Sequence, residues 1–367
     1  MIGTLNKALS ANSTSKERLV WIDVAKLYGI FLVFYSHFLD DLYFRGNEQV
    51  FYHCKFIHSF HMPLFFIMSG FFTKVPSAGF DSFLKKQISR RLRPVLFFGA
   101  MTLPFWVMQN LMKTGGISLD LIRRIVSYAL GRPHLNFITW FLVCLFVVEL
   151  INYFVLPHLK TQTKLVTGIL IFYVVGWLVT WQSITIADQL GIPNNIWFIP
   201  EAIIAYSFYL FGHLLARSGW LGEKSGSKVM NVLLFVIMLV VTAFTFDLNQ
   251  GPFWEAFPIV NMAESWHGNI ILFPLTALSG SFLMFSLSRL TPAHPFVRYA
   301  GKNTLILLGL NGFFEHFFNR AIPDLVANET NAIAIAAYAA VVSLTSMLVC
   351  LPFIPLFNKF VPQLVGK

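Results

Sequence analysis

Charged residues are scarce in this sequence. Only 12% of its 367 residues are charged, about half the share of an average soluble domain, whereas 56% are hydrophobic and Phe alone occurs 40 times. A soluble globule of this length needs a polar exterior, and this composition does not provide one. The scarcity excludes a soluble globular protein and predicts an integral membrane protein.

Cysteine and acidic residues are also few. The cysteines Cys54, Cys144 and Cys350 are too few and too scattered for a disulfide framework or a CxxC metal site. Seventeen Asp and Glu against 27 Lys and Arg leave a net charge of +10. In a soluble protein this charge would suggest a nucleic-acid partner. Whether it does so here depends on where the Lys and Arg residues lie relative to the apolar segments.

Long apolar runs dominate the chain. A helix needs roughly 20 apolar residues to cross the hydrocarbon core of a bilayer. We predict an all-α polytopic membrane protein in which residues 18–358 form a single bundle of about ten transmembrane helices. Residues 1–17, polar and with no signal-peptide pattern, are expected to be a disordered cytoplasmic segment, and 359–367 a cytoplasmic tail. The predicted spans are about 22–39, 56–73, 94–112, 137–156, 165–182, 196–216, 229–246, 268–288, 301–318 and 333–356.

The distribution of Lys and Arg predicts the orientation. With both termini inside, 19 of the 27 basic residues fall on inner segments and seven on outer ones, while Lys26 lies within the first span. The net charge then reflects the positive-inside rule. We therefore predict the lipid bilayer as a partner and no nucleic acid. The predicted outer loop 113–136 runs against the rule, because it carries four basic residues.

The first predicted span carries ionisable side chains that need a reason. A charged group inside a span costs roughly 2.5–3.5 kcal/mol on insertion scales. Lys26 and His37 are eleven residues apart, about 16 Å along a helix, and eleven residues make about three turns. Both side chains therefore point to nearly the same face. This face carries a cation near one membrane surface and an imidazole near the other.

The loop after the second span is strongly basic. Residues 74–93 contain six Lys and Arg, including Arg90 and Arg93. Positive charge gathered at an inner opening suits a phosphorylated ligand arriving from the cytoplasm. Arg91, Lys85 and Lys86 are interpreted as topology signals.

These motifs resemble a known family. The segments are Arg18…Asp23-x-x-Lys26…His37, then His61-Met-Pro63-Leu-Phe-Phe-x-x-Ser69-Gly70-Phe, then Arg90-x-x-Arg93. Together they resemble the membrane-bound acyltransferase family 3, most closely its exopolysaccharide, O-antigen and fucose O-acetyltransferase branch. Looser agreement continues through Trp140-Phe-Leu, Phe208-Tyr-Leu-Phe-Gly212 and Gly301-Lys-Asn-Thr304-Leu. One departure is Asn311, where many relatives carry His.

The resemblance implies a function. Relatives transfer an acyl group, usually acetyl, from acyl-CoA to hydroxyls of cell-surface glycans or their lipid-linked precursors in the bacterial inner membrane. Acetyl-CoA would be a co-substrate, with no permanently bound cofactor. Lys26, Arg90 and Arg93 would neutralise its phosphates, and His37 would act as general base or as the nucleophile of an acyl-His intermediate.

Each of these residues also has a structural interpretation. His37 could be a buried structural histidine, and Arg90 and Arg93 could bind lipid headgroups. Asp23 could merely neutralise Lys26 one turn away. His61 either supports His37 in catalysis or marks a kink beside Pro63. Ser69, in the second motif, is predicted to be a supporting residue of the site.

Further polar side chains are candidates for acceptor binding. Glu149 and Glu201 lie within predicted spans and Trp266 at an outer mouth, and packing inside the bundle is the alternative role for the acids. The histidines His58 and His61, with His37, invite a metal interpretation. No nearby in-span carboxylate or Cys completes a ligand set, so no metal is predicted.

A transporter or flippase for a glycan or lipid-linked intermediate is the alternative function. Ten spans, buried charges and an inner basic patch suit both classes. A transporter predicts two related halves or broken helices at matching positions, and neither is visible in the sequence. It also leaves the spacing of Lys26 and His37 unexplained.

Overall fold

The computed structural model describes residues 19–191, 193–219, 227–250, 259–292, 294–318 and 322–367. The predicted disordered segment 1–17, and Arg18 of the first motif, lie outside the described residues. Within these ranges every element is a helix and no strand occurs. The predicted all-α polytopic membrane fold is confirmed.

The helices differ greatly in length. The first half contains α2 (Val20–Phe44), α3 (Phe51–His58), α4 (His61–Phe71), α5 (Phe80–Gln87), α6 (Arg93–Thr114), α7 (Leu119–Val126), α8 (Trp140–Val155) and α9 (Gln162–Leu190). The second half contains α10 (Ile199–Ser218), α11 (Lys228–Thr245), α12 (Leu272–Leu290), α13 (Pro295–Lys302), α14 (Thr304–Phe313), α15 (Ile322–Val326), α16 (Ala332–Cys350) and α17 (Phe353–Phe360).

Seven helical stretches in the described ranges are long and apolar enough to cross a membrane. They are Val20–Phe44, Phe80–Thr114, Phe137–His158, Gln162–Leu190, Ile196–Ser218, Lys228–Thr245 and Ala332–Phe360. The three other predicted spans take different forms. Span 268–288 is α12, whereas 56–73 and 301–318 are broken helices.

The two breaks lie at polar positions. The chain turns at Ser59 and Phe60 between α3 and α4, and at Asn303 between α13 and α14. Asn303 is held there because its side chain donates to the Tyr299 carbonyl (2.8 Å) and accepts from Lys367 Nζ (2.9 Å). Broken helices persist at membrane depth only where protein covers the freed backbone groups, and both breaks are buried among neighbouring helices.

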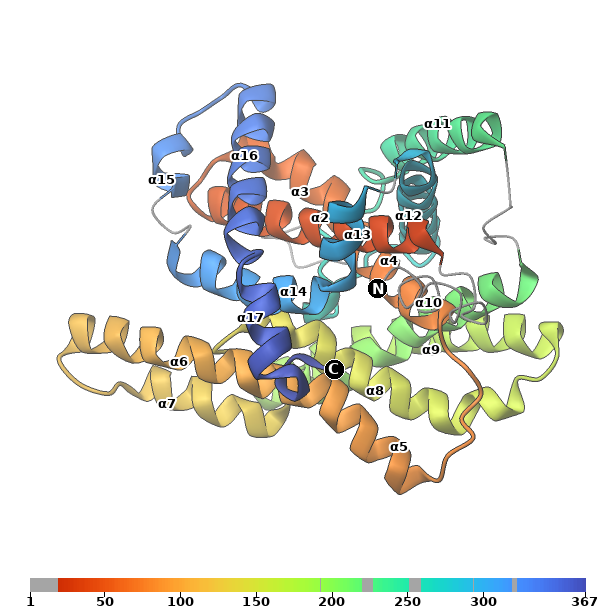
Figure 1. The fold of residues 1–367 in the computed structure, drawn as a ribbon, viewed down its shortest axis with the longest axis horizontal. Coiled ribbons are helices and arrows are strands. Elements are labelled where there is room, and N and C mark those ends of the chain that lie inside the picture. The colour runs from red at the N-terminus through yellow and green to blue at the C-terminus, as the bar shows by residue number, and fades with distance from the viewer. Residues whose placement is uncertain (1–18, 192, 220–226, 251–258, 293, 319–321) are drawn as a thin grey trace, which may run out of the picture.

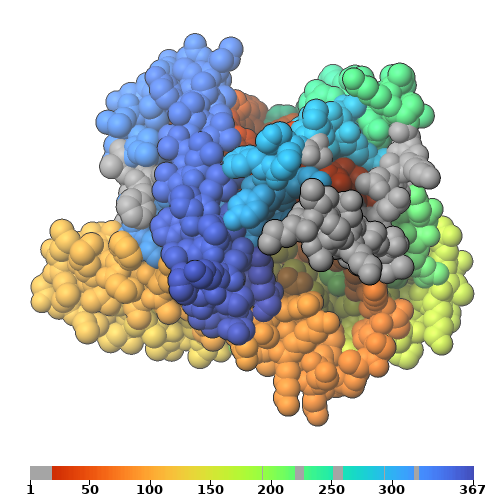
Figure 2. Space-filling model, viewed as in Figure 1, coloured from red at the N-terminus to blue at the C-terminus, as the bar shows by residue number. Residues whose placement is uncertain are grey.

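Helix α2 is the centre of the bundle. It crosses the middle of Figure 1 and packs against α4, α12, α13, α14 and α16. Helices α16 and α17 form a ridge down one face, as Figure 2 shows. The final 3₁₀ helix, Pro362–Val365, packs against α6 and the basic segment before it, so the predicted tail is folded against the bundle.

Helices α4 and α10 approach each other through two glycines. A Cβ at Gly70 would run into the carbonyl of Tyr209, and one at Gly212 into the carbonyl of Ile67. Small residues allow backbones this close in membranes, where dispersion contacts and hydrogen bonds replace the hydrophobic driving force. This contact fixes α4, and with it the second motif, against α10.

The replacement Gly212→Ala tests this contact. We expect it to lower the stability of the protein by about 1–3 kcal/mol, because the added methyl forces two backbones apart. The readout is the melting temperature of the purified protein in detergent. Gly79→Ala is the matched control, since no atom lies within 4 Å of its Cβ position. Equal melting temperatures for the two variants would contradict the close packing.

Candidate active site

One pocket collects most of the motif residues. It has a volume of about 300 Å³, and one face of α2 forms its floor with Lys26, Ile30, Val33, His37 and Asp40. These positions follow the spacing of a single helix face. Lys26 and His37 therefore line the same cavity from its two ends, as their separation of eleven residues predicts.

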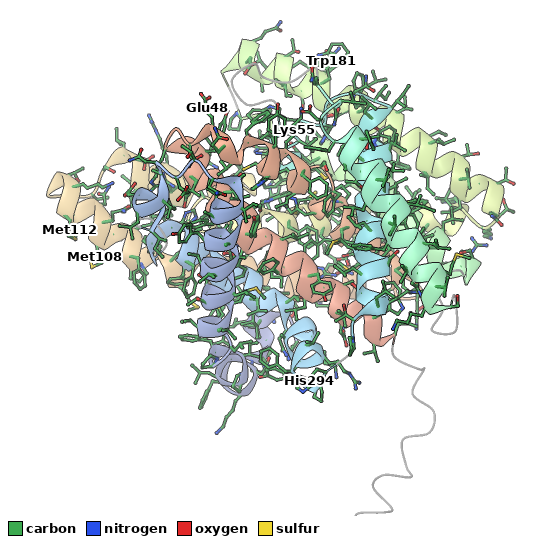
Figure 3. The ribbon with its side chains drawn as sticks, turned by 90° about the horizontal axis from the view of Figure 1, so that it is seen from above. Glu48, Lys55, Met108, Met112, Trp181 and His294 are labelled. Carbon is green, nitrogen blue, oxygen red and sulfur yellow. The ribbon has the colours of Figure 1, made fainter. Side chains whose placement is uncertain are left out.

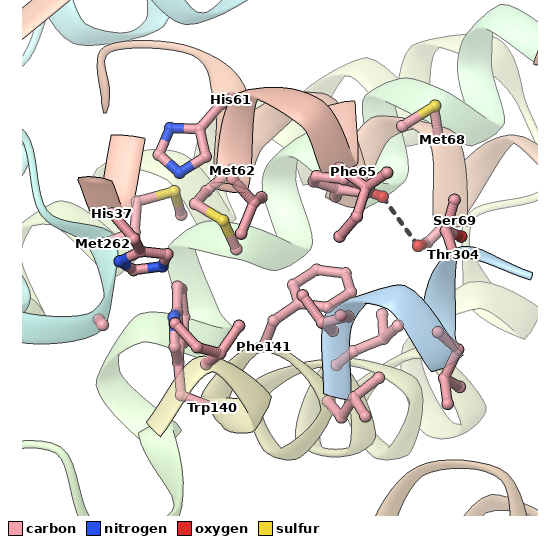
Figure 4. Close-up of a pocket in the computed structure, with 18 of the residues that line it drawn as sticks. His37, His61, Met62, Phe65, Met68, Ser69, Trp140, Phe141, Met262 and Thr304 are labelled. Atoms are coloured by element: carbon pink, nitrogen blue, oxygen red, sulfur yellow. Dashed lines mark hydrogen bonds between the residues drawn. The ribbon is translucent and has the colours of Figure 1, made fainter. Parts of the chain in front are cut away.

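The remaining walls come from distant segments. Helix α4 contributes side chains one turn apart, α8 contributes a wall of aromatic and aliphatic groups, and α14 and the 260–263 turn close the cavity. Figure 4 shows His37 and His61 at one side, with Ser69 and Thr304 at the other. The lining includes His61, Phe65, Ser69, Phe72, Trp140, Phe141, Met262, Thr304 and Leu308.

Histidine and aspartate meet at one end of the pocket. Asp40 lies between two imidazoles: its Oδ2 is 3.6 Å from His37 Nδ1, and its Oδ1 accepts a hydrogen bond from His58 Nε2 (3.1 Å). On the other side, Glu315 Oε1 lies 4.0 Å from His37 Nδ1. Carboxylates beside Nδ1 favour a proton on that nitrogen, which leaves Nε2 able to accept one.

His61 is fixed by the helix break. Its Nδ1 donates to the carbonyl of Ile57 (3.0 Å), and its ring lies 4.9 Å from that of His58 in an edge-to-face arrangement. Because a carbonyl only accepts, Nδ1 carries the proton and Nε2 is an acceptor. The break between α3 and α4 thus gives His61 a defined tautomer inside the pocket.

Two cations stand at the opposite end. Lys26 Nζ lies 5.0 Å from the centre of the Phe72 ring, and Arg91 reaches the pocket from the basic segment. Arg91 forms a bidentate pair with Glu149, with Nη2–Oε1 at 2.6 Å and Nε–Oε2 at 3.0 Å. Glu149, a predicted acceptor-side candidate, therefore anchors a cation of this end.

A π-helical turn selects which arginine faces the pocket. Residues Ile88–Leu92 form a π-helix between α5 and α6, a feature that is frequent at functional sites. Arg90 and Arg93 have exposed side chains and are not part of the lining; Arg93 Nη1 donates to Ser89 Oγ at 3.2 Å. Their role in donor binding stays a prediction. Arg91, interpreted from sequence as a topology signal, is the arginine that the structure places at the pocket.

The other predicted residues are distributed around the site. Ser69 lines the pocket and donates to the Phe65 carbonyl (2.8 Å). Asp23 is buried one turn before Lys26 and outside the lining. Glu201 is buried and accepts a 2.5 Å hydrogen bond from Ser265, and Trp266 packs on a neighbouring apolar cluster. Neither Glu201 nor Trp266 lines the pocket.

Sequence reasoning missed Asp40 and Arg91. Asp40 falls one residue beyond the predicted first span, 22–39, although its position three residues after His37 was a usable signal. For Arg91 the signal was Glu149, since an acid in an apolar helix requires a cationic partner. In the described part of the chain, no group of three or more His, Cys, Asp or Glu is placed to hold a metal ion.

The two ends of the pocket differ in their chemistry. A pair of cations at one end can hold phosphates by charge-assisted hydrogen bonds, and an imidazole flanked by carboxylates at the other can move a proton. Between the two ends, the walls from α4 and α8 are largely apolar.

Replacing Glu149 by Gln tests the buried ion pair. The variant leaves the Arg91 guanidinium without its carboxylate, and we expect a loss of about 1–3 kcal/mol in stability. Thermal unfolding of the purified protein measures this, with the surface pair variant Asp120→Asn as control, because an exposed i,i+4 pair with Arg124 contributes under about 1 kcal/mol. A melting temperature as high as that of the control would contradict a structural role for the pair.

Comparison with known proteins identifies the family of the chain. The chain is 24% identical over 248 residues to the nodulation protein NolL of Mesorhizobium japonicum, a match that spans 66% of this chain and 59% of the relative. No solved structure matches the chain. The acyltransferase domain of family 3 matches residues 19–354, which includes every residue of the pocket. The chain therefore belongs to acyltransferase family 3 and is a multi-pass integral membrane protein.

Proposed function

We propose that the protein transfers an acyl group, specifically acetyl, from acyl-CoA to a hydroxyl of a cell-surface polysaccharide or of its lipid-linked sugar precursor. The single observation that carries the proposal is the pocket, because it holds Lys26 and Arg91 at one end and His37 at the other. Family membership supports acyl transfer, and the resemblance to the polysaccharide branch supports the acceptor.

The cationic end suits the donor. CoA carries its phosphates at one end and its thioester at the other, and Lys26 and His37 lie about 16 Å apart along α2 by helix geometry. Phosphates on Lys26 and Arg91 would direct the thioester along the apolar walls toward His37. Arg90 and Arg93, exposed at the same segment, are positioned to attract the phosphates as they enter.

His37 would perform the proton transfer. Its Nε2 takes the proton of the acceptor hydroxyl as the hydroxyl oxygen attacks the thioester carbonyl; the C–S bond then breaks, and the imidazolium returns the proton to the CoA thiolate. Asp40 and Glu315 would stabilise the imidazolium through Nδ1. The products are the ester and free CoA. A two-step path through acyl-His uses the same groups.

The proposed location is the bacterial inner membrane with both termini in the cytoplasm, which the distribution of Lys and Arg supports. The cationic end then faces the cytoplasmic supply of acyl-CoA, and the His37 end lies toward the opposite surface.

A transporter or flippase is the alternative. The helix breaks at Ser59–Phe60 and Asn303 resemble the interrupted helices of transporters. Both breaks border the pocket of Lys26 and His37, however, and membership of an acyltransferase family favours catalysis there.

Donor binding is the first test. We expect saturable binding of acetyl-CoA to the protein in nanodiscs, measured by calorimetry. Lys26→Ala and Arg91→Gln should each weaken it about tenfold or more, because each removes a charge-assisted contact to phosphate. Arg90→Ala and Arg93→Ala should weaken it less and in a salt-dependent way, as exposed contacts do.

Lys302→Gln, an exposed charge outside the pocket, is the matched control for these variants. A wild-type protein that is folded but does not bind acetyl-CoA would turn the assignment toward the transporter.

Catalysis by His37 is tested separately. His37→Ala should abolish acyl transfer, with a loss of at least a hundredfold, while acetyl-CoA affinity stays near wild type, because the base is lost and the phosphate contacts are kept. The assay follows radiolabelled acetyl groups from acetyl-CoA to membrane glycan in cells expressing each variant. Retained transfer in His37→Ala would remove this residue from the mechanism.

A further inference from the structure

A second, basic groove lies beside the active-site pocket. It has a volume of about 930 Å³ and is lined by Arg123 and Arg124 of α7, by Arg132 and His134 of the following loop, and by Gly191 and Glu264. Its arginines belong to the 113–136 segment, whose charge runs against the positive-inside rule. Topology therefore does not explain them, and a ligand would.

The groove adjoins the histidine end of the pocket. Phe137 lines both cavities. In the 261–264 turn, Ala263 lines the pocket and the next residue, Glu264, lines the groove. His316 also lines the groove, and its neighbour Glu315 lies 4.0 Å from His37. A ligand in the groove would therefore have its attached groups next to His37.

Arg132 offers an unused hydrogen-bond donor to an anion in the groove. The Nε of Arg132 is buried without a hydrogen-bond partner among the described residues. Asp120 is paired with Arg124 (2.9 Å), burial raises the pKa of Glu264, and the charges of Glu264 and Glu201 act on Arg132. Burial, followed by the positive charges of Arg132 and Arg124, lowers the pKa of His134 to about 4.

The wall that carries Arg132 packs against residues in an unusual backbone conformation. Trp197, Phe198 and Ser265 have positive φ angles of 53°, 51° and 62°, a strained conformation that persists only where the surroundings enforce it. Trp197 packs directly on Gly131, next to Arg132. Ser265 donates to buried Glu201 (2.5 Å). This strain gathers behind the groove, as expected of a binding site.

The outer rim of the groove is apolar. Ile122 and Val126 are exposed on α7 and line the groove together with Arg123 and Arg124, and Leu119 is exposed one turn before Arg123. Figure 3 shows Met108 and Met112 projecting from the adjoining end of α6, with 55% and 80% of their surfaces exposed. An amphipathic helix of this kind suits the membrane interface, and there its arginines would lie at the depth of lipid phosphates.

We propose that the groove formed by Arg123, Arg124 and Arg132 binds the phosphate of a lipid-linked acceptor and so presents the attached sugar to His37. The inference rests on the proposed function and narrows its acceptor to the lipid-linked class. The lipid chain would lie along α6 and α7, the phosphate in the groove and the sugar hydroxyl at the pocket. An ordinary anionic membrane lipid has the same chemistry at the phosphate and is the rival occupant.

Binding of a simple probe tests the groove without the acceptor sugar. The full-length protein in phosphatidylcholine nanodiscs is titrated with a radiolabelled polyprenyl diphosphate, with the corresponding polyprenol, and with acetyl-CoA. We expect the diphosphate to bind at least tenfold more tightly than the polyprenol. Arg123→Gln together with Arg132→Gln should reduce that affinity at least tenfold, Arg132→Lys should reduce it less, and acetyl-CoA binding should not change.

Controls separate the groove from general effects. Lys302→Gln should bind the diphosphate as the wild type does, and melting temperatures show that each variant is folded. If Arg132 variants unfold, Arg123→Gln alone carries the test, because its side chain is exposed. Phosphatidylglycerol in the nanodisc should not displace the diphosphate at equal concentration.

Three results would overturn the inference: equal binding of polyprenol, unchanged affinity in the arginine variants, or displacement by either phosphatidylglycerol or acetyl-CoA. Failure of wild-type protein to bind acetyl-CoA would instead count against the proposed function, so the two failures are distinguishable.

Discussion

The structure depends on the cost of placing ionisable groups inside an apolar helix bundle. Helix α2 carries Lys26, His37 and Asp40 on one face, and none of them could remain against lipid without a large free-energy penalty. The bundle solves this by turning that face inward onto a shared cavity. The same constraint explains the bidentate pair of Arg91 with Glu149, which neutralises a cation and an acid that would each be costly alone.

Two broken helices also shape the pocket. At the interruption at Ser59–Phe60 the Ile57 carbonyl accepts from the Phe60 N–H and from His61 Nδ1, which fixes His61. The interruption at Asn303 sets Thr304 at the start of α14 on the pocket wall. Close contact between α4 and α10 through Gly70 and Gly212 holds the first break in position. The geometry of the pocket therefore rests on close backbone packing some distance from its histidines.

In the proposed function, the two cavities bind different substrates of one reaction. The pocket along α2 suits a donor that arrives with its phosphates at Lys26 and Arg91, and the groove on α7 suits an acceptor phosphate near the membrane interface. His37 lies where the two meet. Acceptor binding, as proposed, would account for the arginines of the 113–136 segment, which the orientation of the protein in the membrane leaves unexplained.

The sequence by itself determined the membrane fold class, the placement of most long helices and the common face of Lys26 and His37, because composition, hydropathy and helical periodicity act locally. Tertiary structure decided the rest. A π-helical turn placed Arg91, and not Arg90 or Arg93, at the pocket, and pairing with Glu149, 58 residues away, holds it there. Asp40 reaches His37 from three residues along the same helix, but Glu315 meets it only because the segment after α14 packs against α2. Such contacts depend on which distant surfaces pack, and no local pattern encodes them.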